Sequence, residues 1–201
     1  MRIGPKYKIA RRLGAPVFEK TQTPKYVLSL ARKEKSGTGR SKPKSEFGRE
    51  LTEKQKAKFT YGLNERQFRV YVDKAARTKD PVQKLFAILE SRLDNILFRS
   101  GLAKTRSAAR QMASHGHILI NNKRVTIPSI ILREGNVVSI RASSASSNLF
   151  SEAEERMKTL AAPAWLKIEP KEKTVAVTGM PVYNSTENLF DLGIVIEFYN
   201  R

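Results

Sequence analysis

Cysteine is absent from this chain of 201 residues, so disulfide bonds and thiolate metal sites are excluded. Histidine is nearly absent: His115 and His117 are the only two, and neither has partners at the spacing of metal ligands. We therefore expect no metal, no cofactor and no small-molecule substrate. Long apolar runs and a secretory leader are also missing, so we expect an intracellular protein with no membrane partner.

Acidic residues are scarce relative to basic ones. The chain has 38 Lys and Arg against 19 Asp and Glu, which gives a net charge of +19 and a pI near 10.3. Such a charge favours a polyanion as the partner, and here nucleic acid rather than a membrane surface. Residues 1–79 hold 22 basic and 7 acidic residues, residues 80–148 hold 10 and 4, and residues 149–201 hold 6 and 8. We expect the polyanion to contact the first two segments and the tail to face another partner.

The N-terminal segment, residues 1–50, has little regular pattern because glycine and proline interrupt it repeatedly. We predict a basic, extended segment. Residues 32–44 have the composition of a chain that orders only on a phosphate surface, and a solvated linker is the alternative interpretation. The short apolar islands at 17–18 and 26–28 indicate that parts of the segment pack.

Helix signals follow this segment. A helix is predicted over 51–60, and a second runs from an Asn64 N-cap to about Lys79. Asp80-Pro81 begins a third helix, whose apolar stripe continues to Gly101. Thr105 caps a fourth helix, which ends at Gly116.

Strand and turn signals dominate the remainder. Strands are predicted over 117–121 and 137–141, with a tight turn at Asn121-Asn122 because asparagine tolerates positive φ. A turn at 134–136 precedes the second of these strands. A polar linker at 143–147 leads to an acidic helix ending near residue 161, and strands are predicted over 165–168, 174–178 and 193–199.

Arg106 and Arg110 are the sharpest binding candidates. They lie one turn apart on a predicted helix, so they project from one face. Because no acidic residue occurs between Asp94 and Glu134, we expect both to be exposed and without acidic partners. The alternative is a merely solvated charged face.

The triplet Arg92-Leu93-Asp94 invites a catalytic interpretation, since pseudouridine synthases carry their catalytic aspartate in a similar triplet. Leu93, however, belongs to the apolar stripe, and the flanking sequence is plain helix rather than a substrate-binding turn. We therefore predict that Asp94 is an ion-pair or capping partner and that the chain has no catalytic residue.

The candidate RNA-binding set gathers cations and polar side chains from the N-terminal half, the predicted helices and the hairpin. His115 is included because it lies where a helix meets a strand, and Tyr61 because it could stack on a base beside Gly62. The set comprises Arg2, Lys6, Lys8, Arg11, Arg12, Arg40, Lys42, Lys44, Lys54, Lys56, Lys58, Tyr61, Arg66, Gln67, Arg69, Lys104, Arg106, Arg110, Gln111, His115, Lys123 and Arg124.

These segments carry a family resemblance. Residues 91–141 resemble the S-four RNA-binding module, a helix–helix–hairpin unit. The flanks are similar, in order and spacing, to the small-subunit ribosomal protein S-four family of bacterial type; they are Gly4-Pro5-Lys6 with Arg11-Arg12, Tyr61–Arg69, Pro163–Leu166 and Val195–Tyr199. Many bacterial members hold zinc through four N-terminal cysteines, so this chain resembles a zinc-less variant.

The resemblance implies an α+β fold in three parts. Residues 1–50 would be the basic extension, residues 51–89 a helical domain completed by 149–201, and residues 90–148 the inserted module with a small antiparallel sheet. It also implies a structural role: binding 16S-type ribosomal RNA at a multi-helix junction of the five-prime domain, nucleating small-subunit assembly, and supporting the messenger entry side and decoding accuracy.

The partners implied by the resemblance are small-subunit ribosomal RNA, messenger RNA near the entry channel, and neighbouring small-subunit proteins, above all S-five. The location implied is the small subunit of a cytoplasmic bacterial ribosome rather than an organellar one. Two alternatives share the module: a pseudouridine synthase that modifies RNA, and a heat-shock-type RNA-binding chaperone. The first would need a catalytic domain and the second would be shorter.

Overall fold

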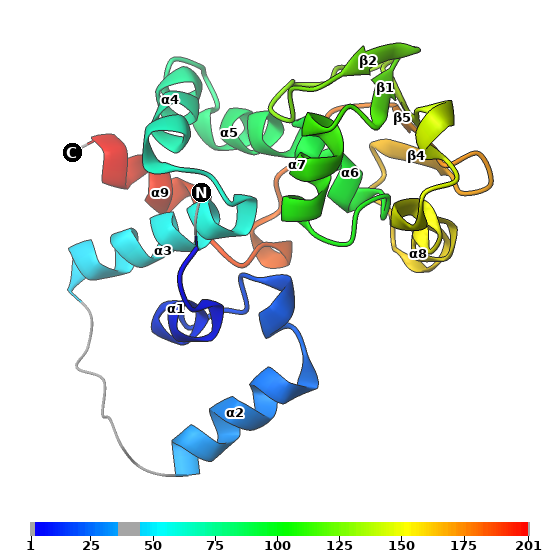
Figure 1. Cartoon of the computed structure of the whole chain (residues 1–201). Coiled ribbons are helices and arrows are strands. Elements are labelled where there is room, and N and C mark those ends of the chain that lie inside the picture. The colour runs from blue at the N-terminus through cyan, green and yellow to red at the C-terminus, as the bar shows by residue number, and fades with distance from the viewer. Residues whose placement is uncertain (1–2, 36–44, 201) are drawn as a thin grey trace. The chain divides into compact units, whose positions relative to one another are not determined.

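The computed structural model describes residues 3–35 and 45–200, without the side chains of 33–35. The chain divides into two compact units (Figure 1). Unit 1 combines the chain up to Leu85 with the C-terminal segment from Asn184, and unit 2 runs from Phe86 to Tyr183. Helices dominate unit 1 and a five-stranded antiparallel sheet lies in unit 2, so the fold is α+β as predicted.

Unit 1 is built from helices that precede and follow unit 2 in the sequence. Helix α5 (Pro81–Glu90) spans the boundary between the units. The other elements of unit 1 are α1 (Lys6–Leu13), η1 (Glu19–Thr21), α2 (Pro24–Lys35), α3 (Glu46–Tyr61), α4 (Glu65–Ala76), η4 (Ser185–Glu187) and α9 (Leu192–Asn200).

The described part of the N-terminal segment is helical, so the prediction of an extended chain is wrong there. Gly14 ends α1 with a φ of +70°, a conformation that glycine adopts without strain. Val17 and Phe18 then turn back into a small apolar cluster with Ala10, Leu13, Ala15 and Tyr26, as the first apolar island indicated. Apolar packing therefore contributes to the stability of this segment.

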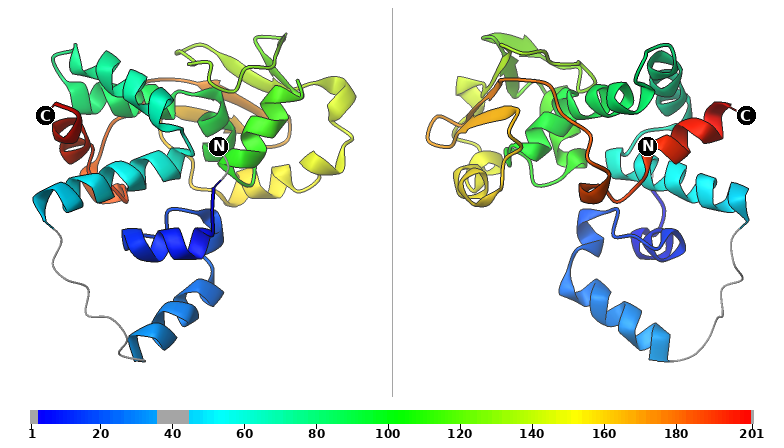
Figure 2. Two further views of the ribbon diagram at one scale, coloured as in Figure 1. Left: turned by 60° about the vertical axis from the view of Figure 1, so that its left-hand side comes forward. Right: turned by 180° about the vertical axis from the view of Figure 1, so that it is seen from behind.

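Helix α9 replaces the strand predicted over 193–199, and this prediction is wrong. The β-branched residues of the segment favour a strand, but packing decides the conformation. Leu192, Val195 and Ile196 are buried at helical spacing. Helices α3 and α9 lie side by side in Figures 1 and 2 and make extensive contact.

Glu65 connects three helices of unit 1. Its carboxylate accepts hydrogen bonds from Lys54 (2.9 Å) and Lys58 (2.8 Å) of α3 and from the Tyr199 hydroxyl (2.6 Å) of α9. Partial burial raises the pKa of Glu65, but these hydrogen bonds outweigh it and lower the pKa to about 2. The carboxylate is therefore stabilised in its charged form.

This arrangement predicts acid sensitivity of unit 1. Because the folded pKa of Glu65 lies below its ordinary value of 4.5, its stabilising effect is present above pH 4.5 and is lost as the pH falls toward 2. Glu65→Gln should flatten this part of the pH dependence and lower stability at neutral pH. Urea unfolding monitored by circular dichroism between pH 2 and pH 7 measures both. An unchanged pH profile in the variant would contradict the assignment.

Unit 2 contains the predicted helix–helix–hairpin and the helices and strands that follow it up to residue 183. Its strand order is β2-β1-β3-β5-β4, with every pairing antiparallel. The core beneath the sheet includes Leu93, Ile96, Ile118, Val138 and Phe150. The elements are α6 (Leu93–Arg99), α7 (Arg106–Ser114), β1 (Ile118–Ile120), β2 (Lys123–Val125), β3 (Val137–Ile140), η2 (Ala142–Ser144), η3 (Asn148–Phe150), α8 (Ala153–Thr159), β4 (Leu166–Glu169) and β5 (Thr174–Val177).

The helix predicted to run from residue 81 to Gly101 is interrupted at residues 91–92, and the expectation of one continuous helix is wrong. Arg92 is extended, with a φ of −68° and a ψ of 142°, and forms a β-bridge to Ile131. The backbone amide of Leu93 donates to the Ile130 carbonyl at 2.8 Å, and the Leu132 amide donates to the Ser91 carbonyl at 2.8 Å. Non-local backbone pairing therefore separates α5 from α6.

The local signals of unit 2 are confirmed. The Thr105 side chain accepts from the Ala108 amide and caps α7. Asn121 and Asn122 both have positive φ, as the tight turn between β1 and β2 requires. Asp94 is an ion-pair partner, as predicted.

Residues 149–183 belong to unit 2, whereas the sequence assigned them to the helical part. Strand β5 pairs with β3, with Val138 opposite Val175, and its Val175 and Val177 are buried in the core of unit 2. The expected boundary after residue 148 therefore does not coincide with the division of the structure. No helix in the described part of the chain has both the length and the hydropathy to cross a membrane.

Candidate nucleic-acid interface

A basic face of unit 2 forms where α7 meets the β1–β2 hairpin. Lys104 precedes α7, Gln111 and His115 lie on it or at its end, and Lys123 and Arg124 lie on β2; all five are exposed. We call these five residues, together with the half-buried Arg106 and Arg110 of α7, the basic face. No Asp or Glu occurs anywhere from residue 95 to residue 133. This face therefore presents cations without neighbouring acidic residues of its own segment.

Gly116 allows the hairpin to join the end of α7. It has a φ of +73°, and a Cβ built there would lie 2.3 Å from Nε of Arg124. The Arg124 guanidinium thus covers the glycine, where it donates to the His115 carbonyl at 3.5 Å. A side chain at position 116 would displace this cation, so glycine here serves both the backbone and the surface.

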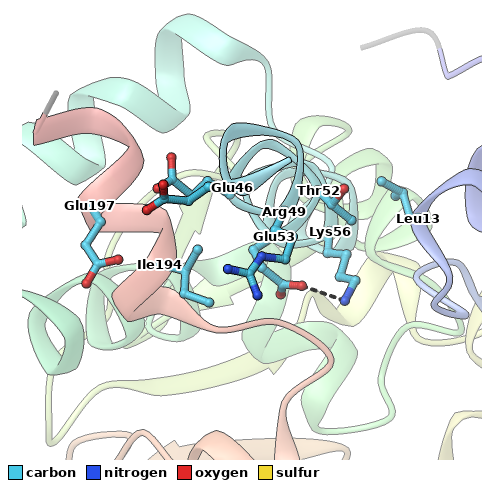
Figure 3. A pocket seen from close by; sticks show the side chains of 9 residues that line it. Leu13, Glu46, Arg49, Thr52, Glu53, Lys56, Ile194 and Glu197 are labelled. Carbon is cyan, nitrogen blue, oxygen red and sulfur yellow. Dashed lines mark hydrogen bonds and ion pairs between the residues drawn. The ribbon is translucent and has the colours of Figure 1, made fainter. Parts of the chain in front are cut away.

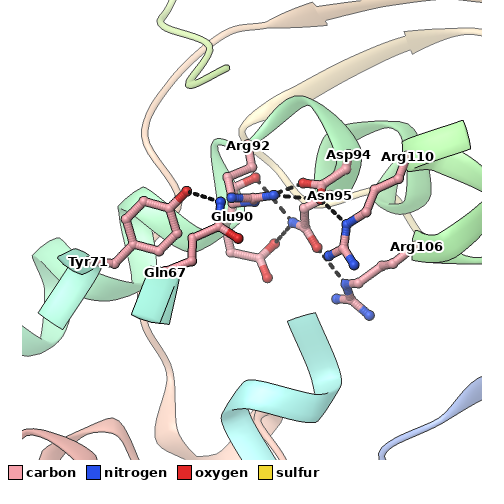
Figure 4. Close-up of polar contacts among 8 residues, drawn as sticks. All are labelled: Gln67, Tyr71, Glu90, Arg92, Asp94, Asn95, Arg106 and Arg110. Atoms are coloured by element: carbon pink, nitrogen blue, oxygen red, sulfur yellow. Dashed lines mark hydrogen bonds and ion pairs between the residues drawn. The ribbon is translucent and has the colours of Figure 1, made fainter. Parts of the chain in front are cut away.

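Asp94 fixes two guanidinium groups from opposite sides. Its carboxylate accepts from Nε and Nη2 of Arg92 at 2.9 and 2.8 Å, and from Nε of Arg110 at 2.7 Å (Figure 4). The Asp94 side chain is 2% exposed and that of Arg92 3%, whereas 27% of the Arg110 side chain reaches the surface. A buried charge pair therefore anchors one cation of the basic face.

Glu90 organises a second group of contacts beside the first. Its carboxylate accepts two hydrogen bonds of 2.9 Å from Arg99 and one of 2.8 Å from the Asn95 amide. The Asn95 carbonyl oxygen in turn accepts from Nε of Arg106 at 2.8 Å, and the Arg106 guanidinium lies 4.2 Å from the centre of the Phe98 ring. The Glu90 side chain is only 2% exposed.

Arg106 and Arg110 are half-buried and have partners, so the expectation that both are exposed is wrong, and the expectation of no acidic partner is wrong for Arg110. The acidic partner of Arg110 is Asp94 itself, which lies one helix earlier in the chain. Sequence reasoning missed Glu90, Asn95 and Arg99 as members of the network. The available signal was the close spacing of two acidic residues, at 90 and 94, within an apolar stripe.

Unit 1 exposes some of the predicted cations and buries others. Lys54 and Tyr61 are buried, with 7% and 2% of their surface exposed, so they do not belong to an exposed binding face. Lys54 and Lys58 bind Glu65, and Lys56 binds Glu53 at 2.7 Å. Lys8, Arg11, Arg12, Arg66 and Arg69 are exposed, whereas Lys6 and Gln67 are half-buried; Arg2, Arg40, Lys42 and Lys44 lie outside the described residues.

Two protein families match successive parts of this chain. The model of the ribosomal protein S4/S9 N-terminal domain matches residues 1–90, and that of the S4 domain matches residues 91–138. Small ribosomal subunit protein uS4 of Halothermothrix orenii is 38% identical over 98% of this chain and 98% of its own length. The uS4 proteins of Roseiflexus sp. (37%, 98% of both chains) and Aquifex aeolicus (38%, 99% of this chain and 98% of the relative) are similarly close.

This chain belongs to the uS4 family. The match covers nearly the whole length, so it includes the flanks as well as the module. The family consists of structural proteins of the small ribosomal subunit and not of enzymes, which decides against a pseudouridine synthase. The basic face described above lies within the S4 domain of this uS4 chain.

A surface hollow of about 360 Å³ in unit 1 has a different character from the basic face (Figure 3). It lies between α3 and α9, and Glu46, Glu53 and Glu197 line it together with Arg49 and Lys56. Glu53 is already paired with Lys56 and accepts from the Asp191 amide at 3.0 Å. In residues 3–35 and 45–200, no three His, Asp or Glu side chains gather in a way that would hold a metal ion.

Proposed function

We propose that this uS4 chain binds small-subunit ribosomal RNA directly, at a multi-helix junction of the five-prime domain, and nucleates assembly of the subunit there. The observation that carries the proposal is the basic face of unit 2, with Arg110 anchored by a buried carboxylate and Lys123 and Arg124 exposed on the hairpin. Phosphates crowd where RNA helices join, and fixed cations neutralise them and stabilise one arrangement of the helices.

Unit 1 supplies a second set of cations to the same RNA. Lys8, Arg11 and Arg12 are exposed on α1, and Arg66 and Arg69 are exposed on α4. Residues 1–79 carry most of the excess positive charge of the chain. RNA binding through both units depends on where the positive charges lie and involves no chemical reaction, which fits a structural role.

We place a protein neighbour at the C-terminal helix, with S-five as the candidate. The C-terminal segment of unit 1, residues 184–201, holds three acidic residues and one basic residue, and its Glu197 lines the hollow together with Glu46 and Glu53. Phe47 is 54% exposed beside Phe198, which adds apolar surface. A contact there would support the messenger entry side and decoding accuracy in the ribosome of a bacterial cytoplasm.

The proposal predicts a steep dependence of RNA affinity on salt. If about six phosphates are neutralised, the slope of log affinity against log salt should be about −4, and steeper on compact RNA. Filter binding to a small-subunit five-prime-domain transcript between 50 and 200 mM potassium chloride measures it. Lys123→Ala with Arg124→Ala should reduce the slope, whereas Lys167→Ala, on the edge strand β4, should not. A slope near zero would contradict the proposal.

A further inference from the structure

We infer that Asp94 is a positioning residue for RNA recognition: its buried carboxylate holds the Arg110 guanidinium in the one orientation that a phosphate can use. This inference rests on the proposed RNA-binding function and deepens it. The specificity of the basic face would then depend on the buried Asp94 carboxylate, which itself does not contact RNA. Asp94 is not accessible to a substrate as a catalytic aspartate would be, because its side chain is only 2% exposed and both of its oxygens accept hydrogen bonds from Arg92.

The geometry supports orientation rather than simple neutralisation. Arg110 donates through Nε to Oδ2 of Asp94 at 2.7 Å, so the bond constrains the inner edge of the planar group. Arg92, which is itself buried, grips the same carboxylate through two hydrogen bonds and prevents it from turning. The carboxylate is therefore held on both sides before any ligand arrives, and a preorganised cation loses less freedom on binding.

The neighbouring contacts repeat the same design. Asn95 is fixed by Glu90 through its amide nitrogen at 2.8 Å, and its oxygen holds Nε of Arg106 at 2.8 Å. Arg106 and Arg110 reach from α7 toward adjacent residues of α6, one turn apart and side by side (Figure 4). Two guanidinium groups at fixed separation match consecutive phosphates of an RNA strand better than two mobile ones.

An effect of net charge alone, here called charge counting, and the orienting role of Asp94, here called positioning, make opposite predictions for Asp94→Asn. Asp94→Asn removes a negative charge next to the RNA-binding face, so charge counting predicts tighter binding. Positioning predicts weaker binding, because in either orientation the amide NH2 of Asn faces a guanidinium N–H where a carboxylate oxygen accepts in Asp94, so the three hydrogen bonds from Arg92 and Arg110 cannot all be kept. We expect affinity for the five-prime-domain transcript to fall about tenfold, as when a group that orients a binding residue is lost.

The experiment measures filter binding at low salt for the wild-type chain, Asp94→Asn, Arg110→Ala and the double variant, each first shown by circular dichroism to be folded. If Asp94 acts through Arg110, Asp94→Asn should have little effect in the Arg110→Ala background. A purely structural role would leave the effect undiminished there. Unchanged or tighter binding by Asp94→Asn in the otherwise intact chain would overturn the inference.

Arg110→Lys tests the same idea without altering the buried carboxylate, and it decides the matter if Asp94→Asn does not fold. Lysine keeps the charge but lacks the planar guanidinium group. Positioning therefore predicts about tenfold weaker RNA binding, whereas an effect of charge alone predicts no change in affinity. Arg133→Lys, in the exposed turn before β3 and outside the basic face, is the matched control and should bind normally. Normal binding by Arg110→Lys overturns the inference alone, whereas failure of the wild-type chain to bind the transcript overturns the proposed function.

Discussion

Asp94→Ala should lower the free energy of unfolding by about 3–5 kcal/mol, because it leaves the buried Arg92 charge without its carboxylate. The pair need not contribute much net stability when intact, since both charges lose solvent on folding. The large cost arises from removing only one of them. Trp165, the single tryptophan of the chain, packs against the core of unit 2, so its fluorescence in urea reports the unfolding.

Glu155→Ala is the control for this prediction. Glu155 is exposed on α8 in the same unit, and its replacement should change stability by less than about 0.5 kcal/mol. Equal stability of Asp94→Ala and the wild-type chain would show that Arg92 does not depend on Asp94.

Leu93→Ala should be comparably destabilising for a different reason. Leu93 is fully buried in the core of unit 2, and its truncation should cost about 2–5 kcal/mol through lost apolar contact and the cavity left behind. Its side chain is fully buried and cannot contact RNA, so RNA affinity per folded molecule should be unchanged. Thermal melts together with filter binding, corrected for the folded fraction, separate the two effects. Weaker binding by fully folded Leu93→Ala would contradict this separation.

Local chemistry made part of the fold predictable. The caps at Asn64, Asp80 and Thr105 each depend on one side chain and the backbone amide three residues ahead. The Asn121-Asn122 turn likewise depends on the conformational range of its own residues. Such signals depend only on neighbouring residues, so these helix starts and this turn could be predicted from the sequence.

Features that depend on distant residues were not predictable in this way. The break before α6 arises because residues 130–132 pair with the backbone at 91–93, nearly forty positions away. Helix α9 forms from β-branched residues because α3 offers a surface for a helix. The partners of Arg106 and Arg110 that the sequence did not predict lie on a different helix. Periodicity within α7 could therefore show that the two arginines share a face, but it could not show their hydrogen bonds to α6.

Tethered cleavage of RNA tests the proposed interface most directly, because a chain without cysteine accepts a single engineered attachment point. Ser107→Cys lies exposed on α7 next to Arg106, and Ser151→Cys lies exposed just before α8. With an iron chelate attached to each, we expect Ser107→Cys to cleave the five-prime domain of small-subunit ribosomal RNA at discrete positions and Ser151→Cys to give only background. Equal cleavage from both, or cleavage from Ser151→Cys alone, would contradict RNA binding through this face.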